Sequence, residues 1–198
     1  MDTERSTFNI LISGVGGQGV VLASYVLSRV ALAEGYDVKQ SEVHGMAQRG
    51  GCVTSHLRFG DKVYSALITP RTADVLLSFE QVEALRYVHW LKPGGLLVYN
   101  AARVNPSTVS TGAVEYPERI DERIAHAWPN VRKVDASGLA ARAGTVKAAN
   151  VVMLGAMASA LPFTPEMLES VIRKSVPPKT VDVNLAAFRL GLEVAVPV

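Results

Sequence analysis

The first forty residues combine a short apolar run, a glycine-rich turn and a long segment with periodic apolar positions. Residues 8–13 read FNILIS, which is typical of a strand. Apolar side chains recur at helical spacing from 20 to 34, and Gly35 stands where a helix commonly ends. A second strand is predicted over 36–41. This order has the length of a βαβ unit.

The middle of the chain alternates predicted strands with predicted helices. Residues 42–51 (EVHGMAQRGG) lack apolar periodicity and are interpreted as a loop. Strict alternation over 52–59 predicts a strand, and the Gly60-Asp61 pair predicts a tight turn into 62–64, so a β-hairpin is expected. Further strands are predicted at 75–78, 95–99 and 131–135, and further helices at 80–90 and 117–127.

The C-terminal third is predicted to be helical. One buried helix is expected over 148–160, a second begins at Pro165 after the N-cap Thr164, and a third covers 181–194. Strands that alternate with helices predict a Rossmann-like, three-layer α/β/α fold with a mainly parallel sheet, plus the hairpin and this helical third. No repeat or low-complexity linker interrupts the chain, so residues 1–198 are predicted to form a single domain.

Composition adds a constraint on the surface. The 198 residues are 48% hydrophobic and only 19% charged, against roughly 25% charged in typical soluble domains. Either the core is large or a partner covers part of the surface. The net charge of +2 argues against nucleic-acid binding. The most apolar run, 148–161, is shorter than the roughly 20 residues that span a bilayer, and no secretory signal is visible, so a cytoplasmic protein is expected.

A single cysteine limits the chemistry of this chain. Cys52 alone excludes a disulfide framework, a self-contained zinc ribbon and a cubane iron–sulfur site, each of which needs several thiolates. No metal site is therefore expected on this chain, and Cys52 itself is interpreted as a small buried hydrophobe. No complete catalytic motif of a hydrolase, zinc peptidase or phosphate-binding loop is present.

The glycine turn is the first candidate site. The sequence GVGGQG matches G-x-G-x-x-G between a strand and a helix, where glycines let a ligand approach the backbone and the helix N-terminus attracts an anion. Its candidate ligand-binding positions are Gly14, Gly16, Gly17, Gln18 and Gly19. The alternative is a tight connection that binds nothing.

The position that would recognise a nicotinamide dinucleotide carries no acid. A dinucleotide site requires an acidic residue at the end of the second strand, but Lys39 and Gln40 stand there. This argues against NAD, whereas Lys39 is compatible with an additional phosphate and is kept as a cofactor-binding candidate.

The loop at 42–51 is the second candidate site. His44 can transfer protons near neutral pH, and Arg49 offers a planar fork for carboxylate or phosphate; both are catalytic candidates, and Gln48 and Gly50 are binding candidates. This loop is expected at the same sheet edge as the glycine loop. The alternative is that Arg49 pairs with Glu42 and His44 only caps the turn.

The remaining histidines are given structural roles. His56 is predicted on the solvated face of a strand, and His89 and His126 on helix surfaces.

The two loops together resemble a known family. GVGGQGV at 14–20, HGMAQRGG at 44–51 and TVKAANVVMLGA at 145–156 are similar to the gamma-type subunit of 2-oxoacid:ferredoxin oxidoreductases, most closely the branch acting on indolepyruvate. The resemblance covers nearly the whole chain.

The resemblance implies a reaction that needs a second chain. It implies a complex that converts an aryl pyruvate to acyl-CoA with thiamine diphosphate, Mg and iron–sulfur clusters, and that reduces ferredoxin. These cofactors would belong to a larger alpha subunit in an alpha2beta2 assembly, while this chain completes the active site and helps to bind coenzyme A. Two alternatives stay open: a free-standing nicotinamide- or flavin-binding module, and a scaffold whose loops form only an interface. The particular oxoacid also stays open.

Overall fold

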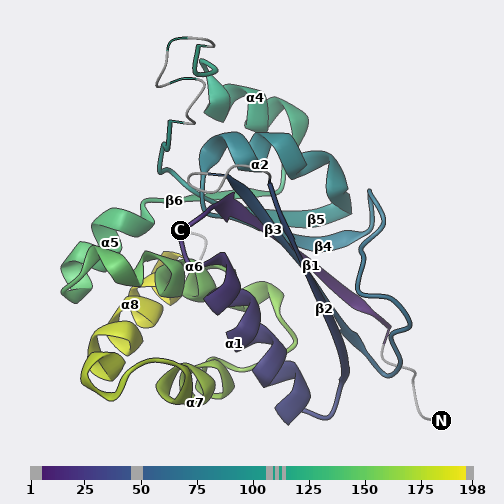
Figure 1. The fold of residues 1–198 in the computed structure, drawn as a ribbon, viewed down its shortest axis with the longest axis vertical. Coiled ribbons are helices and arrows are strands. Elements are labelled where there is room, and N and C mark those ends of the chain that lie inside the picture. Colours follow the sequence, from purple (N-terminus) through teal and green to yellow (C-terminus); the bar gives the residue numbers. More distant parts are fainter. Residues whose placement is uncertain (1–5, 46–50, 106–108, 110–111, 113–114, 195–198) are drawn as a thin grey trace.

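The computed structural model describes residues 6–45, 51–105, 109, 112 and 115–194, and Figure 1 shows their arrangement. Within these residues, six strands form one sheet in the order β2-β3-β1-β4-β5-β6. Five strands run in the same direction, and β3 is antiparallel to both of its neighbours. The strands are β1 (Phe8–Val15), β2 (Asp37–His44), β3 (Cys52–Gly60), β4 (Ala73–Ser78), β5 (Leu91–Asn100) and β6 (Val131–Val134).

Helices cover both faces of the sheet and make the three predicted layers (Figure 1). One face carries α1 (Val20–Ala33), α5 (Ala136–Ala143), α6 (Ala149–Met157), α7 (Pro165–Ser175) and α8 (Val181–Val194), and the other carries α2 (Gln81–Tyr87) and α4 (Ile120–Ala127). Consecutive side chains of β1 show the division. Ile10 and Ile12 pack in the core cluster on the α1 side, and Leu11 packs in the cluster on the α2 side. The mainly parallel α/β prediction is confirmed.

The predicted helices are confirmed, with one addition. Short 3₁₀ turns extend three of them: Val88–Trp90 after α2, Ala158–Ala160 after α6 and Pro178–Thr180 before α8. The hydroxyl of Thr164 accepts a hydrogen bond from the Met167 amide, as an N-cap residue should. Helix α5 was not predicted, because half of its eight residues are alanine and the segment gives little periodic signal. No helix in the described part of the chain has the length and apolarity to cross a membrane.

The predicted hairpin over 52–64 is wrong. No strand follows Gly60 until β4, and β3 instead pairs with β2 over eight residue pairs, from Asp37 opposite Gly60 to His44 opposite Val53. That long ladder replaces the short pairing expected with 62–64. Side-chain contacts hold the connecting segment outside the sheet: the Val63 amide donates to Asp37, and Arg58 donates to the carbonyls of Ser65 and Leu67. As a result, β3 lies between β1 and β2.

The solvated position predicted for His56 is also wrong. Its side chain is buried, Nδ1 accepts a hydrogen bond from the Ile68 amide at 3.2 Å, and its ring lies edge-on to Trp90. Burial lowers the pKa of His56 and favours its neutral form. The alternation of β3 suggested one polar face, but this strand is central and both of its faces are covered. His89 and His126 are exposed, as predicted.

Helices α6 and α8 cross at two glycines. A β-carbon on Gly155 would lie 2.1 Å from the carbonyl oxygen of Phe188, and one on Gly191 would lie 2.1 Å from that of Val152. No real β-carbon approaches an oxygen so closely, so this contact between backbones requires glycine at both positions. Gly155 lies in the 145–156 segment that carries part of the family resemblance.

Candidate functional site

The glycine loop connects the carboxyl end of β1 to α1, and its glycines have different physical roles. Gly17 and Gly19 adopt left-handed φ angles of 93° and 87°. A β-carbon on Gly14 would press on Val20 and Phe79 at 3.0 Å. At Gly16, by contrast, φ is not in the left-handed region, and among the described residues a β-carbon would meet only the carbonyl oxygen of Gly51, 3.8 Å away. Packing therefore favours glycine at 14, and backbone conformation favours it at 17 and 19, whereas the described residues give neither reason for Gly16.

Gln18 ties this loop to the neighbouring strand. Its Oε1 accepts a hydrogen bond from the Val15 amide at 2.7 Å, and its Nε2 donates to the Phe79 carbonyl at 3.1 Å. Phe79 directly follows β4, so the side chain bridges the carboxyl ends of β1 and β4. Gln18 was a candidate ligand-binding position, but both atoms of its side-chain amide bond to backbone groups, so the geometry supports a bridging role.

The crevice between β1 and β4 is filled with protein groups. The connections change face here, since α1 follows β1 on one side and α2 follows β4 on the other. Ser13 donates to the hydroxyl of Ser78 at 3.0 Å, and Ser78 donates to the carbonyl of Glu80. A Rossmann enzyme places its dinucleotide in this crevice and recognises the ribose from the strand beside β1. Here Ser13, Ser78 and Gln18 make hydrogen bonds across the crevice, and β3 separates β2 from β1, so the geometry disfavours a dinucleotide-binding module.

The loop between β2 and β3 lies directly against the glycine loop. The amide of Gly16 donates to the carbonyl of Gly51 at 3.0 Å, and the amide of Gly45 donates to that of Cys52 at 2.7 Å. The two candidate loops thus meet at one edge of the sheet, as predicted. The candidates Gln48, Arg49 and Gly50 lie outside the described residues.

A hollow of about 590 Å³ lies where these loops meet the start of α1. Its walls are mostly apolar, with the backbone of the glycine loop on one side. His44 supplies an imidazole and Tyr25 a phenol among the described lining residues. Its lining includes Gly16, Gly19, Val21, Tyr25 and His44. The hollow offers apolar contact together with uncapped backbone amides.

Hydrogen-bond donors lie where the hollow meets the start of α1: the backbone amides of the first turn and the side-chain amide of Asn150. Helix α1 begins after Gly19, which has no side chain to cap the first turn. The buried Asn150 of α6 lies against Gly19, because a β-carbon there would be 2.5 Å from its Nδ2. Asn150 Oδ1 accepts from the Val151 amide, while Nδ2 donates to none of the described residues.

Lys39 lies far from the glycine loop. It pairs with Asp37 at 2.6 Å and stands opposite Arg58, which is itself opposite Asn9 near the start of β1. Five residues separate it from His44, which corresponds to roughly 16 Å along a strand. The structure therefore does not bring Lys39 to the glycine loop. The sequence placed it at the end of a shorter strand, whereas β2 continues to His44.

Cys52 belongs to a polar cluster that the sequence did not indicate. The half-buried thiol donates to Glu83 Oε2 at 2.9 Å and lies 3.4 Å from the Tyr87 hydroxyl. Burial and the hydrogen bond to the Glu83 carboxylate raise the pKa of Cys52 to about 11. The prediction of a plain hydrophobe is therefore wrong. The partner is 31 residues away in sequence and no local pattern reveals it.

The surroundings of Cys52 do not suit a cluster ligand. A cluster needs several thiolates, and the one thiol here is protonated at neutral pH. Among the residues that the structure describes, no three His, Cys, Asp or Glu side chains converge as metal ligands.

The raised pKa of Cys52 predicts slow alkylation in the folded chain. With a pKa of about 11, only roughly a thousandth of the thiol is ionised at pH 8. An unfolded cysteine with a pKa of about 8.5 is about a quarter ionised. We expect iodoacetamide to react at least 50-fold more slowly with the native chain than with the urea-unfolded chain, roughly in line with these thiolate fractions. The native rate should rise about tenfold per pH unit up to pH 10.

The variant Glu83→Gln removes the carboxylate that opposes ionisation, so it should lower the pKa of Cys52 and accelerate alkylation. A native rate that levels off below pH 9 would contradict this assignment.

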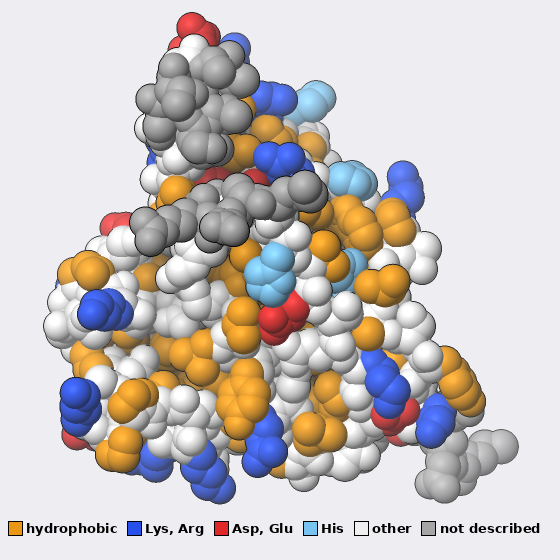
Figure 2. All heavy atoms as spheres, viewed as in Figure 1, with side chains coloured by type: hydrophobic (Ala, Val, Ile, Leu, Met, Phe, Trp, Pro, Cys, Tyr) orange, Lys and Arg blue, Asp and Glu red, His pale blue; other side chains and the backbone are white. Residues whose placement is uncertain are grey.

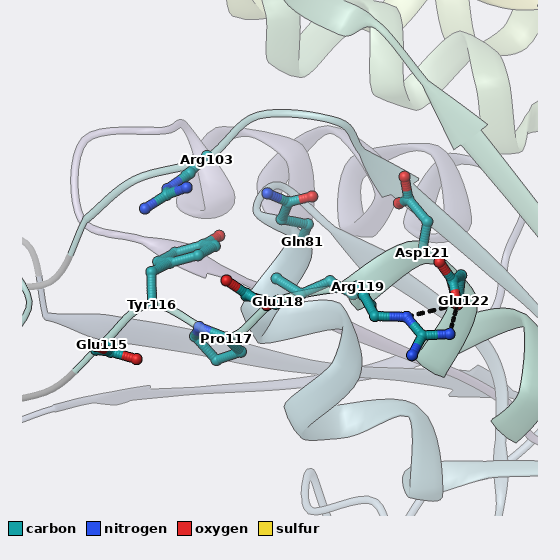
Figure 3. A pocket seen from close by; sticks show the side chains of 10 residues that line it. Gln81, Arg103, Glu115, Tyr116, Pro117, Glu118, Arg119, Asp121 and Glu122 are labelled. Carbon is teal, nitrogen blue, oxygen red and sulfur yellow. Dashed lines mark hydrogen bonds and ion pairs between the residues drawn. The ribbon is translucent and has the colours of Figure 1, made fainter.

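A second hollow, of about 550 Å³, lies on the α2 side of the sheet (Figure 3). Arg103 stacks over the ring of Tyr116 at 3.9 Å, and Arg119 pairs with Glu122. The Tyr116 hydroxyl donates to the buried carboxylate of Glu80 at 2.5 Å. Acids outnumber the two arginines along this wall, so it lacks the positive charge that an anionic ligand requires.

Fold and site together define a Rossmann-like α/β module that presents two loops at one sheet edge and has no redox centre among its described residues. The chain belongs to the pyruvate ferredoxin/flavodoxin oxidoreductase family, which matches residues 9–194. The family belongs to oxoacid oxidoreductase complexes that use thiamine diphosphate and iron–sulfur clusters.

Individual relatives match over almost the full length. Indolepyruvate oxidoreductase subunit IorB of Pyrococcus horikoshii is 48% identical over 193 residues, covering 95% of this chain and 96% of that protein. IorB of Thermococcus kodakarensis is 46% identical over 194 residues, with the same coverage. The solved gamma subunit of a keto/oxoacid ferredoxin oxidoreductase from Geobacter sulfurreducens has a TM-score of 0.67 at 26% identity, covering 95% of this chain and 98% of that one.

These matches confirm the family resemblance of the two loops. The chain is a homologue of IorB and a small subunit of the 2-oxoacid:ferredoxin oxidoreductase type, which works in a complex with larger subunits.

Proposed function

We propose that this chain is the small subunit of a thiamine-dependent oxidoreductase that converts an aryl pyruvate, such as indolepyruvate, to acyl-CoA and reduces ferredoxin. The identity of 48% with an indolepyruvate oxidoreductase subunit, over nearly the whole of both chains, carries this proposal. In that complex the chain completes the active site and contributes to coenzyme A binding.

The edge formed by the two loops is the proposed ligand-facing surface. Gly16 supports this role, since a ligand that approaches the backbone explains a glycine that packing does not require. The uncapped start of α1 and the nearby Asn150 Nδ2 supply donors that suit a diphosphate. His44 and Arg49 are the candidates for proton transfer and for binding a carboxylate or phosphate.

The electron-transfer cofactors are assigned to a larger alpha subunit, in an alpha2beta2 assembly. The single cysteine supports this division, because it is hydrogen-bonded to Glu83 and its pKa is raised to about 11. This chain would hold none of the thiamine diphosphate, Mg or clusters itself.

Calorimetric titration of the assembled complex with coenzyme A tests the ligand role. Gly16→Val is the most informative variant, because a β-carbon on Gly16 would stay 3.8 Å from the nearest described atom, whereas the larger side chain would block approach to the backbone. We expect at least tenfold weaker binding, roughly the effect of losing 1.4 kcal/mol, with little change in thermal midpoint. Arg49→Ala should weaken binding by removing a charge-assisted hydrogen bond.

Gly35→Ala, at the far end of α1, is the control and should bind coenzyme A normally. Unchanged affinity in both Gly16→Val and Arg49→Ala would exclude the ligand role and favour the scaffold alternative, in which hydrogen exchange of both loops in the complex is insensitive to coenzyme A. Turnover of indolepyruvate, phenylpyruvate and pyruvate by the same preparation ranks the substrates, and indolepyruvate is expected to be best.

A further inference from the structure

Helix α1 is largely apolar even on the side that faces solvent. Its 14 residues include one charged side chain, Arg29. The inner side packs in the core through residues such as Ala23 and Leu27. On the outer side, Val21 and Tyr25 are each 47% exposed and Leu32 is 52% exposed. A helix that is hydrophobic all round is normally buried all round, so this surface is expected to be covered in the working protein.

A neighbouring surface helix follows the usual amphipathic pattern. Helix α7 buries Leu168 and Ile172 and exposes Glu166, Arg173 and Lys174. The apolar exterior of α1 is therefore a property of that helix and not of the whole surface. Spacings of four, four and three residues place Val21, Tyr25, Arg29 and Leu32 on one side, which we call the α1 face.

The α1 face is continuous with the hollow between the two loops. Val21 and Tyr25 belong to both surfaces. In Figure 2, hydrophobic side chains gather over the region that α1 occupies in Figure 1. A chain that covered the α1 face would therefore also lie over the glycine loop.

The one charge on the α1 face supplies a second feature for recognition. Arg29 is exposed and makes no hydrogen bond or ion pair with any described residue. A complementary partner would have an apolar surface that contacts the α1 face. That surface would also carry a carboxylate to pair with the Arg29 guanidinium. Arginine and tyrosine are also the residue types that most often dominate binding energy at protein interfaces.

We propose that the α1 face is the docking surface for the larger subunit, and that it receives an apolar segment whose carboxylate pairs with Arg29. This inference rests on the proposed function. In the proposed function, the larger chain holds the cofactors, and these must come close to the hollow between the glycine loop and the β2–β3 loop. The α1 face begins at that hollow, so the chain that brings the cofactors is the one placed to cover it. A second copy of this chain would bring no cofactor to the loops.

Co-expression with the larger, thiamine- and iron-containing chain tests the proposal. We expect Tyr25→Glu and Leu32→Glu each to weaken association at least tenfold in titrations of the purified subunits. Arg29→Glu should weaken it by a similar factor. Each variant should keep the wild-type circular dichroism and thermal midpoint, because all three positions are exposed. Tyr64→Glu is the matched control, since Tyr64 is an exposed aromatic residue that does not belong to the α1 face, and it should associate normally.

The outcomes separate this inference from the proposed function. If the wild-type chain fails to bind the larger subunit, the proposed function fails. If wild-type binds and all three α1 variants bind equally well, the α1 face is not the docking surface. If the isolated wild-type chain is a dimer that Tyr25→Glu converts to a monomer, the occupant is a second copy and the proposal is overturned.

Discussion

Replacing Gly191 with alanine is expected to destabilise the folded chain by about 3 kcal/mol, because overpacking at this site forces backbone and not only side chains to move. The new β-carbon would lie 2.1 Å from the Val152 carbonyl oxygen, so α6 and α8 would have to separate. For a domain of this size, such a loss lowers the thermal midpoint by roughly 6–12 °C. Gly155→Ala should behave alike, because its β-carbon would meet the Phe188 carbonyl at the same distance.

Gly138→Ala is the matched control for this prediction. A β-carbon there would also meet an oxygen, at 2.2 Å, but the oxygen belongs to the side chain of Asp135. That side chain can turn away and lose its cap to the Gly138 amide, which costs about 1 kcal/mol and is offset by the better helix propensity of alanine. Denaturant titrations in which Gly191→Ala and Gly138→Ala gave equal midpoints would refute the backbone-contact argument.

Replacing Glu80 with alanine is expected to cost about 3 kcal/mol, since the change leaves buried donors without an acceptor. The carboxylate caps α2 through the amides of Val82 and Glu83, and its other oxygen accepts from Tyr116 and Val104. Losing the cap costs about 1 kcal/mol, and the unpaired buried hydroxyl adds about 1–3 kcal/mol. Chemical denaturation with circular dichroism measures the loss.

Tyr116→Phe isolates one of these hydrogen bonds. It removes a donor and leaves the α2 cap intact, so we expect a loss of about 1 kcal/mol. If Tyr116→Phe cost as much as Glu80→Ala, the cap on α2 would contribute nothing and the assignment of Glu80 as its N-cap would be wrong.

The sequence was sufficient for the layers, most helices and the meeting of the two loops. Apolar periodicity identified α1, and the rule that parallel strands present their carboxyl ends at one edge placed Gly16 near the loop that ends at Gly51. Periodicity identifies strands but not which strands pair. For that reason β3 was assigned to a hairpin with the following residues, although it pairs with β2 and β1. The error over His56 has the same origin, because its burial depends on the position of β3 inside the sheet.

The sequence motif assigned the same ligand-binding role to residues that have different roles or positions in the structure. Packing favours glycine at 14 and backbone conformation favours it at 17 and 19, whereas the described residues give neither reason for Gly16. Lys39 was near the loop in sequence terms but lies towards the opposite end of β2. Contacts between distant residues, such as Cys52 with Glu83, leave no local pattern and could not be predicted.

The bridge made by Gln18 has a consequence for the thermodynamics of any binding event at this edge. Its hydrogen bonds to Val15 and Phe79, together with the bond from Gly16 to Gly51, hold the glycine loop in one conformation before a ligand or partner arrives. The loop is therefore pre-organised, and little conformational entropy is lost there on association. Weakening the bridge would leave the contacts of the bound state unchanged. It would reduce affinity because the unbound loop would gain conformational freedom, which binding would then have to remove.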